Sequence, residues 1–132
     1  MPHAHAYAYA DTVHALAALV PPGRVLSYGD VAELLTSPER PGAGGPRQVG
    51  AAMAAAPTDL PWWRILRADG TLPDDLAERA APHWDAEGTP RRGARIDMAA
   101  ARWQPDDAGF AAIDRLAEAL AAPAPAPRAR RS

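Results

Sequence analysis

Two adjacent tryptophans, Trp62 and Trp63, constrain the fold of this chain more than any other feature of its sequence. Such a pair is unusual here, because only 6% of the 132 residues are aromatic. Pro61 restricts the backbone before the pair and biases Leu60 towards an extended conformation. The run that follows, residues 62–66, has the composition of a short β-strand. Side chains alternate across a strand, so the two indoles are predicted to point to opposite sides.

This alternation is compatible with two interpretations of the pair. In the first, one ring packs in the core while the other forms the wall of a cavity. In the second, both rings are ordinary core residues. The pair alone does not decide between them, and the rest of the chain has to be considered.

Length and composition exclude several classes of protein. The chain is long enough for one domain with a modest core. It has no cysteine, which excludes disulfides, thiolate metal sites and a cysteine nucleophile. The net charge is −2 and every basic residue outside the histidines is arginine, so no global basic field indicates nucleic-acid binding. With no membrane-spanning run and no signal peptide, we expect a soluble, cytoplasmic protein without cofactor or metal.

The first half of the chain is predicted to form three helices. Residues 1–10 are expected to be a flexible terminus, in which His3 and His5 lack a third metal ligand. A helix over 11–20, capped by Asp11, should end at the prolines that follow. The S-x-x-D pattern from Ser27 should open the next helix. After a loop over 36–45, Pro46 suits the first position of a helix over 47–56. Its inward stripe would be Val49, Ala52, Met53 and Ala56.

The second half is predicted to add a small β element and two more helices. A turn over 68–71 should follow the central strand, and a helix over 76–87 should end at Gly88. Residues 94–98 are expected to pair with the central strand, and Trp103 to anchor the core. A last amphipathic helix over 106–122 would carry Phe110, Ile113, Leu116 and Leu120 on its apolar side, before a disordered Ala/Pro/Arg tail over 123–132. The predicted fold is mainly α with a small β element, a winged helix-turn-helix.

Three sequence blocks occur in a fixed order and carry a family resemblance. They are residues 25–32 (VLSYGDVA), 47–53 (RQVGAAM) and 61–64 (PWWR). In this order they resemble the DNA-binding domain of the O6-alkylguanine-DNA alkyltransferase family, over residues 11–104. The last block of that family is Pro-Cys-His-Arg, whose cysteine accepts the alkyl group. Trp62 stands at the cysteine position, as in the alkyltransferase-like proteins.

The resemblance implies a binding protein rather than an enzyme. Alkyl transfer needs a nucleophile activated by an adjacent base. Trp62 replaces the nucleophile and Trp63 replaces the histidine that would be the base, so no catalytic residue is expected. What remains is a pocket for O6-alkylguanine, formed by Trp62, Trp63 and Tyr28. An aromatic wall can stack on a base for roughly 1–3 kcal/mol.

The same resemblance implies a set of DNA contacts. Arg47 matches the arginine that fills the gap left by an extruded base, and Tyr28 the tyrosine that helps to rotate the nucleotide outwards. The small residues Ala51 and Ala54 would let the helix approach a minor groove about 6 Å wide. The further predicted contacts are Gln48, Gly50 and Arg64. Alternatives stay open: Tyr28 as a core aromatic, Arg47 as a solvated surface residue and Arg64 as a structural ion-pair partner. Trp63, bulkier than the usual histidine, could also crowd the cavity or pack behind it.

Some positions depart from the family pattern. Ala56 and Pro57 stand where the family has Asn-Pro, and Asp74 and Asp75 lie near the expected pocket rim, where they would repel phosphate. Between positions 24 and 67 five arginines face four carboxylates, so electrostatic affinity should be modest and salt-dependent.

The favoured hypothesis is therefore a protein, expected to be monomeric, that binds O6-alkylguanine in double-stranded DNA and flags it for nucleotide excision repair proteins. The alternative is a winged-helix DNA-binding protein or regulator without damage recognition. A third hypothesis is a protein-interaction role for the segment 105–122 and the arginine tail.

Overall fold

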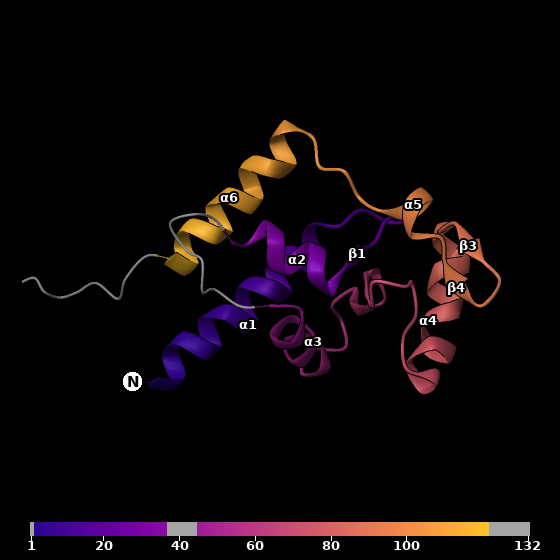
Figure 1. Ribbon diagram of the computed structural model, residues 1–132, viewed down its shortest axis with the longest axis horizontal. Helices are drawn as coiled ribbons and strands as arrows, with labels where there is room; N and C mark the ends of the chain where they lie inside the picture. Colours follow the sequence, from indigo (N-terminus) through magenta and orange to yellow (C-terminus); the bar gives the residue numbers. More distant parts are fainter. Residues whose placement is uncertain (1, 37–44, 122–132) are drawn as a thin grey trace, which may run out of the picture.

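The computed structural model describes residues 2–36 and 45–121. Its helices are α1 (Pro2–Leu19), α2 (Tyr28–Leu34), α3 (Pro46–Ala54), α4 (Asp74–Glu87), α5 (Met98–Ala101) and α6 (Asp107–Ala121), with a 3₁₀ helix η1 (Trp62–Arg64). The strands are β1 (Leu26–Ser27), β2 (Ile65–Leu66), β3 (Arg91–Arg92) and β4 (Arg95–Ile96). Figure 1 shows α6 beside α1 and α2 at one end of the molecule, and α4 with the β3–β4 hairpin at the other end. Most of the predicted loop over 36–45 and the predicted tail lie outside the described residues.

Helix α1 starts earlier than the sequence predicted. It begins at Pro2, a residue suited to a first helical turn, so the expected flexible terminus over 1–10 is wrong. The physical reason is Tyr9, which is only 6% exposed and lies one turn before the buried Val13. Packing of this ring against the core extends the helix towards the N-terminus. Asp11 is consequently an exposed residue within the helix and not its cap.

Helix α2 opens with the capping box that the S-x-x-D pattern predicted. The backbone N–H of Asp30 donates to Ser27 Oγ, and the backbone N–H of Ser27 donates to Asp30 Oδ2, both at 2.9 Å. Two backbone donors at the helix start are thereby satisfied. The helix buries Val31, while Leu34 is half-buried. This cap places Tyr28 in the first turn, directly after β1.

The cap can be tested by replacing Ser27 with alanine. We expect the free energy of unfolding to fall by about 1 kcal/mol, because the backbone N–H of Asp30 loses its acceptor. Urea unfolding of the variant and the wild type measures this difference. Ser27→Thr keeps a hydroxyl acceptor and serves as the control. Equal stability of the alanine variant and the wild type would contradict the role assigned to the cap.

Helix α3 has the predicted start and the predicted faces. Pro46 occupies its first turn, and Val49, Ala52 and Met53 are buried. Arg47, Ala51 and Ala54 are exposed. The helix ends at Ala54, two residues before the predicted end, and the half-buried Ala56 still packs against the core.

The central strand is shorter than predicted and has a different partner. Trp62–Arg64 forms a 3₁₀ turn, closed by hydrogen bonds from Arg64 N–H to Pro61 O and from Ile65 N–H to Trp62 O. Only Ile65–Leu66 is extended, and it pairs in parallel with β1, Leu26 opposite Ile65. The expected pairing of residues 94–98 with this strand is wrong. Instead β4 pairs antiparallel with β3 across a turn at Gly93, which adopts φ +64°.

Helices α4 and α6 have close to their predicted bounds. Gly88 ends α4 in the left-handed region at φ +70°, as predicted. Asp106 accepts from the backbone N–H of Gly109 at the start of α6. Of the residues expected on the apolar side of this helix, Ile113 is buried, whereas Phe110 is 46% exposed. Phe110 borders a groove with Leu34 and the half-buried Trp103, and the side chain of Leu120 lies outside the described residues.

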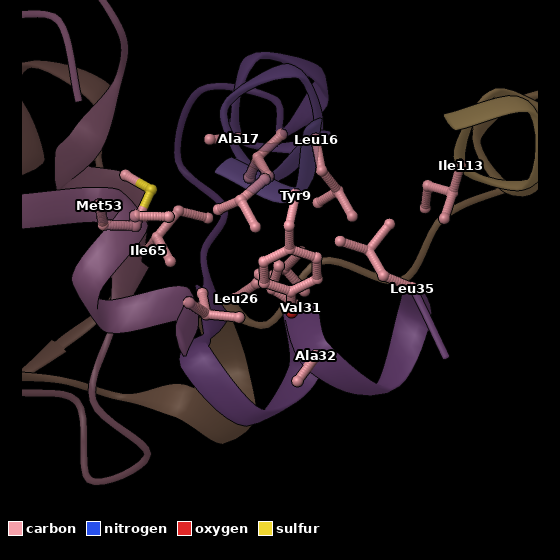
Figure 2. Packing of buried hydrophobic residues seen from close by; sticks show 14 of the residues in the cluster. Tyr9, Leu16, Ala17, Leu26, Val31, Ala32, Leu35, Met53, Ile65 and Ile113 are labelled. Carbon is pink, nitrogen blue, oxygen red and sulfur yellow. The ribbon is translucent and has the colours of Figure 1, made fainter. Parts of the chain in front are cut away.

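The interior consists of two hydrophobic clusters. The first joins α1, α2, α3 and α6 around Leu16, Leu26 and Val31 (Figure 2). The second lies at the α4 end of the molecule, where β2, α4 and β4 pack together around Leu66, Trp84 and Ile96. Trp62 packs against both clusters, so it lies at the junction between the helix-turn-helix and α4. Within the described ranges no helix is long and apolar enough to cross a membrane, and no three His, Asp or Glu side chains form a group able to hold a metal ion.

Candidate nucleic-acid interface

An open cavity of about 260 Å³ lies beside α3. This volume is just below the ~300–1,000 Å³ typical of sites for drug-sized ligands, so it suits a group of the size of one nucleobase. The lining is mostly apolar and comes from α2, α3, η1, β2, the segment before α4 and the first turn of α4. It consists of Tyr28, Gly50, Met53, Ala54, Trp62, Ile65, Arg67, Leu72, Pro73 and Leu76.

Trp62 is a wall of this cavity and is backed by α4. Its ring is half-buried, with the guanidinium of Arg79 5.8 Å from the ring centroid. The imidazole of His83 meets it edge-on at 6.2 Å. The indole is therefore supported from one side by α4 and borders the cavity on another. This placement decides between the two interpretations of Trp62, because the ring is not sealed in the core.

Trp63 stands behind Trp62 and does not line the cavity, so its placement among the pocket residues is wrong and the alternative that it packs behind the cavity agrees with the structure. The two indoles meet edge to face at 84°, with centroids 5.7 Å apart. Trp63 stacks on His83, with centroids 3.7 Å apart and rings 8° from parallel. Its Nε1–H donates to Glu87 Oε2 at 2.8 Å, and its carbonyl accepts from Trp84 Nε1 at 2.8 Å. Trp63 thus joins η1 to α4 and holds Trp62 in place.

Arg64 points into the protein rather than towards solvent. Its Nη2 lies 2.6 Å from Glu87 Oε2, and the two side chains are 13% and 12% exposed. Its Nη1 donates to the carbonyl of Val20 at 2.8 Å. These contacts match the alternative interpretation of Arg64 as a structural ion-pair partner and leave its guanidinium unavailable to DNA.

The carboxylate of Glu87 is stabilised by four donors. Burial alone would raise its pKa, but hydrogen bonds from Arg64, from the backbone N–H of Gly23 and from the Trp63 indole act in the opposite direction. Together with the charge of Arg64 they hold the pKa of Glu87 below its usual value. The ion pair therefore ties the end of α4 to η1 and to the turn after α1.

Tyr28 faces the cavity from the first turn of α2. Its ring packs against Gly50 of α3, where an added Cβ would lie 3.6 Å from the ring. Burial raises the pKa of the Tyr28 hydroxyl, and the nearby charge of Arg67 partly offsets this effect. The hydroxyl thus stays protonated at neutral pH and can donate a hydrogen bond. A Cβ at that distance would make ordinary van der Waals contact, so the packing of the Tyr28 ring on α3 does not require a glycine at position 50.

The exposed face of α3 runs from Arg47 past Ala51 to Ala54, at the rim of the cavity. Residues three and four apart share a helix face, so Arg47 lies one turn before the cavity. Gln48, a predicted DNA contact, instead bonds locally, because its Oε1 accepts from the backbone N–H of Gly45 at 2.9 Å. The structure thus brings Tyr28, Gly50, Ala54 and Trp62 together around one cavity, with Arg47 and Ala51 beside it.

Several cavity residues were missed by the sequence analysis, chiefly Leu72, Pro73 and Leu76. They follow the turn at Gly70, whose carbonyl accepts from the backbone N–H of Ile96. That long-range contact folds the segment back over the cavity and has no sequence signal of its own. Asp74 and Asp75 lie between Pro73 and Leu76 in the chain, but neither lines this cavity.

Comparison with known proteins agrees with this geometry. The family described as "6-O-methylguanine DNA methyltransferase, DNA binding domain" matches residues 8–89, which is more than half of the chain and includes every residue of the cavity. The chain belongs to this family. The resemblance drawn from the three sequence blocks is thereby confirmed.

Relatives within and near this family carry informative names. The "DNA base-flipping protein" of Escherichia coli K12 is 35% identical over 102 residues, which covers 72% of this chain and 74% of the relative. The protein of the same name from Shigella flexneri matches equally well. The crystal structure of S. pombe Atl1 with damaged DNA containing O6-carboxymethylguanine superposes with a TM-score of 0.61 at 22% identity, covering 74% of this chain and 95% of that one. This likeness confirms the predicted mainly helical, winged helix-like fold.

Proposed function

We propose that this protein recognises alkylated guanine in double-stranded DNA by holding the extruded base in the cavity walled by Trp62. The open cavity beside α3 is the observation that carries the proposal. It is supported by relatives named for base flipping and by a similar fold crystallised with DNA containing O6-carboxymethylguanine.

The cavity offers the interactions that an extruded purine needs. Extrusion costs a few kcal/mol of unstacking and unpairing, and an alkylated, poorly paired guanine costs least. Stacking of the base on Trp62 offsets this cost by roughly 1–3 kcal/mol. The apolar lining from Met53, Leu72 and Leu76 suits an alkyl group better than the polar O6 of an unmodified guanine.

The exposed face of α3 is the proposed contact with the duplex. Ala51 and Ala54 present only methyl groups, so the helix backbone can approach a minor groove closely. Arg47, one turn earlier, is placed to enter the base stack and replace the extruded nucleotide. Its exposed guanidinium can donate hydrogen bonds to the orphaned partner base.

We further propose that the protein binds damage without repairing it. Alkyl transfer would need a nucleophile, and the chain has no cysteine. Of the two aromatic side chains that line the cavity, the Trp62 indole has no ionisable nucleophilic atom, and burial raises the pKa of the Tyr28 hydroxyl, which keeps it protonated. A base that is held and not processed leaves a long-lived complex, which suits a signal to nucleotide excision repair proteins.

Fluorescence anisotropy of labelled duplexes tests the proposal. At one fixed salt concentration the protein is titrated into duplexes that are identical except for O6-methylguanine or guanine at one position. We expect tighter binding of the modified duplex by at least about tenfold, equivalent to about 1.4 kcal/mol. Equal affinities would refute damage recognition and favour the alternative of a plain winged-helix DNA-binding protein. Transfer of a labelled alkyl group from the DNA to the protein would refute the non-enzymatic assignment.

A further inference from the structure

A second cavity, of about 510 Å³, adjoins the Trp62 cavity and is bordered by arginines. Arg67 and Leu72 line both cavities. Beyond them the second cavity is bounded by the start of α4 and by the β3–β4 hairpin, which contributes Arg92 and Arg95. Three guanidinium groups therefore border one hollow next to the proposed base pocket, against one carboxylate of its lining, Asp74.

The hairpin brings two of these charges into direct opposition. Arg92 and Arg95 are cross-strand partners, so both side chains project from the same face of the hairpin. Like charges at such a pair destabilise a hairpin unless an anion lies between them. The closest carboxylate oxygen is Asp97 Oδ2, at 3.8 Å from Arg92, and the Arg92 side chain stays 73% exposed. Within the described ranges the guanidinium groups of Arg67 and Arg95 have no hydrogen bond or ion pair.

Arg91, on the same hairpin, differs from Arg92 and Arg95 because its guanidinium group already has close partners within the protein. Its Nη1 lies 2.7 Å from Asp85 Oδ1, and its guanidinium packs 5.5 Å from the centroid of the Trp84 ring. Arg91 is thus occupied by contacts within the protein. Arg67, Arg92 and Arg95 are available to an external anion.

At the α4 end of the molecule the exposed positive charge lies on the hairpin and on Arg67, because α4 itself carries five carboxylates against the single Arg79. Helix α6, at the end opposite the hairpin in Figure 1, carries Asp107, Asp114 and Glu118 against a single Arg115. A polyanion bound at α3 would be repelled at the α6 end, whereas at the other end the exposed guanidinium groups of the hairpin would attract it and the carboxylates of α4 would oppose this attraction. The favourable direction for a DNA strand leaving the Trp62 cavity is therefore across Arg67 towards β3 and β4.

We propose that Arg67, Arg92 and Arg95 form a binding site for backbone phosphates of the DNA strand that carries the extruded base. Guanidinium groups bind phosphate oxygens through paired, charge-assisted hydrogen bonds, and an anion here relieves the repulsion between Arg92 and Arg95. The inference rests on the proposed function, because it takes DNA as the ligand. The proposed site adds the β3–β4 hairpin to the DNA interface as a phosphate contact that is independent of the base sequence.

The salt dependence of binding tests this site. The double variant Arg92→Ala/Arg95→Ala is titrated with guanine and O6-methylguanine duplexes at several sodium chloride concentrations. Each phosphate contact contributes about 0.9 to the slope of log affinity against log salt, so we expect the slope to become shallower by about 1.8. The effect should be equal for both duplexes, which leaves the preference for O6-methylguanine unchanged. Asp74→Asn removes the opposing charge and should instead tighten binding of both duplexes.

Two matched variants control for net charge and folding. Arg91→Ala removes one cation from the same hairpin, and Arg115→Ala removes one from α6; both should keep the wild-type slope. A double variant with the wild-type slope would overturn the proposal, as would an equal loss in the Arg115 variant. The cavity could instead bind free phosphate. In that case inorganic phosphate will raise the melting temperature of the wild type but not of the double variant, while the two proteins bind DNA with the same affinity. This result would also overturn the proposal. Failure of the proposed function would appear separately, as a wild type without preference for O6-methylguanine.

Discussion

Replacing Trp62 with alanine is expected to reduce the preference for O6-methylguanine over guanine by roughly 5- to 150-fold. This range corresponds to the roughly 1–3 kcal/mol that stacking of one base on an aromatic ring provides. The loss should fall on the modified duplex, because only the extruded base reaches the indole. Affinity for an unmodified duplex depends on phosphate contacts and α3 and should change little. Paired titrations of the two duplexes at fixed salt measure the ratio directly.

Two further variants separate the loss of stacking from a loss of folding. Trp62 packs against both hydrophobic clusters, so its removal also lowers stability. Trp62→Phe keeps an aromatic face and should retain part of the preference. Trp103→Ala removes a half-buried indole that does not line the cavity and should leave the ratio intact. If the Trp103 variant loses the preference as Trp62→Ala does, or if Trp62→Ala keeps it while folded, Trp62 is not the stacking wall.

The features predicted well from sequence are those set by local chemistry. The capping box at Ser27, the proline at the start of α3 and the glycine at the end of α4 all act within one helical turn. The exposed face of α3 follows from helical spacing alone. The place of Trp62 in the pocket was inferred from three motifs that occur in a fixed order. Such an order is a property of a family fold and not of local conformational preference.

The errors concern contacts between distant segments. No local pattern could show that Trp63 would find His83 and Glu87, twenty and twenty-four residues further on. The strand pairing was missed for the same reason, because a two-residue strand has too little periodicity to identify its partner. Arg64 is a further example, since its burial is set by a carboxylate on α4 that the sequence does not place.

Replacing Arg64 with alanine is expected to lower the free energy of unfolding by about 3–5 kcal/mol. Glu87 would keep its burial but lose a cation, and breaking a buried ion pair by removing one partner leaves the other charge uncompensated. The carbonyl of Val20 would also lose its donor. Urea unfolding near neutral pH measures the loss. Arg102→Ala is the control, since its pair with Asp30 has the same kind of contact but side chains 42% and 23% exposed. We expect it to cost less than about 1 kcal/mol.

The pH dependence of the same variants identifies Glu87 as the cause. Because the folded pKa of Glu87 is depressed, its contribution to stability is present above the unfolded value of about 4.3 and is lost as pH falls through the folded value. In the Arg64→Ala protein the main opposing charge is gone, so the pKa of Glu87 is less depressed and this acid-sensitive contribution shrinks. The stability difference between wild type and variant should therefore narrow between about pH 5 and pH 3. A difference that stays constant over this range, or an Arg64 variant as stable as the Arg102 variant, would show that α4 is held to η1 by packing alone.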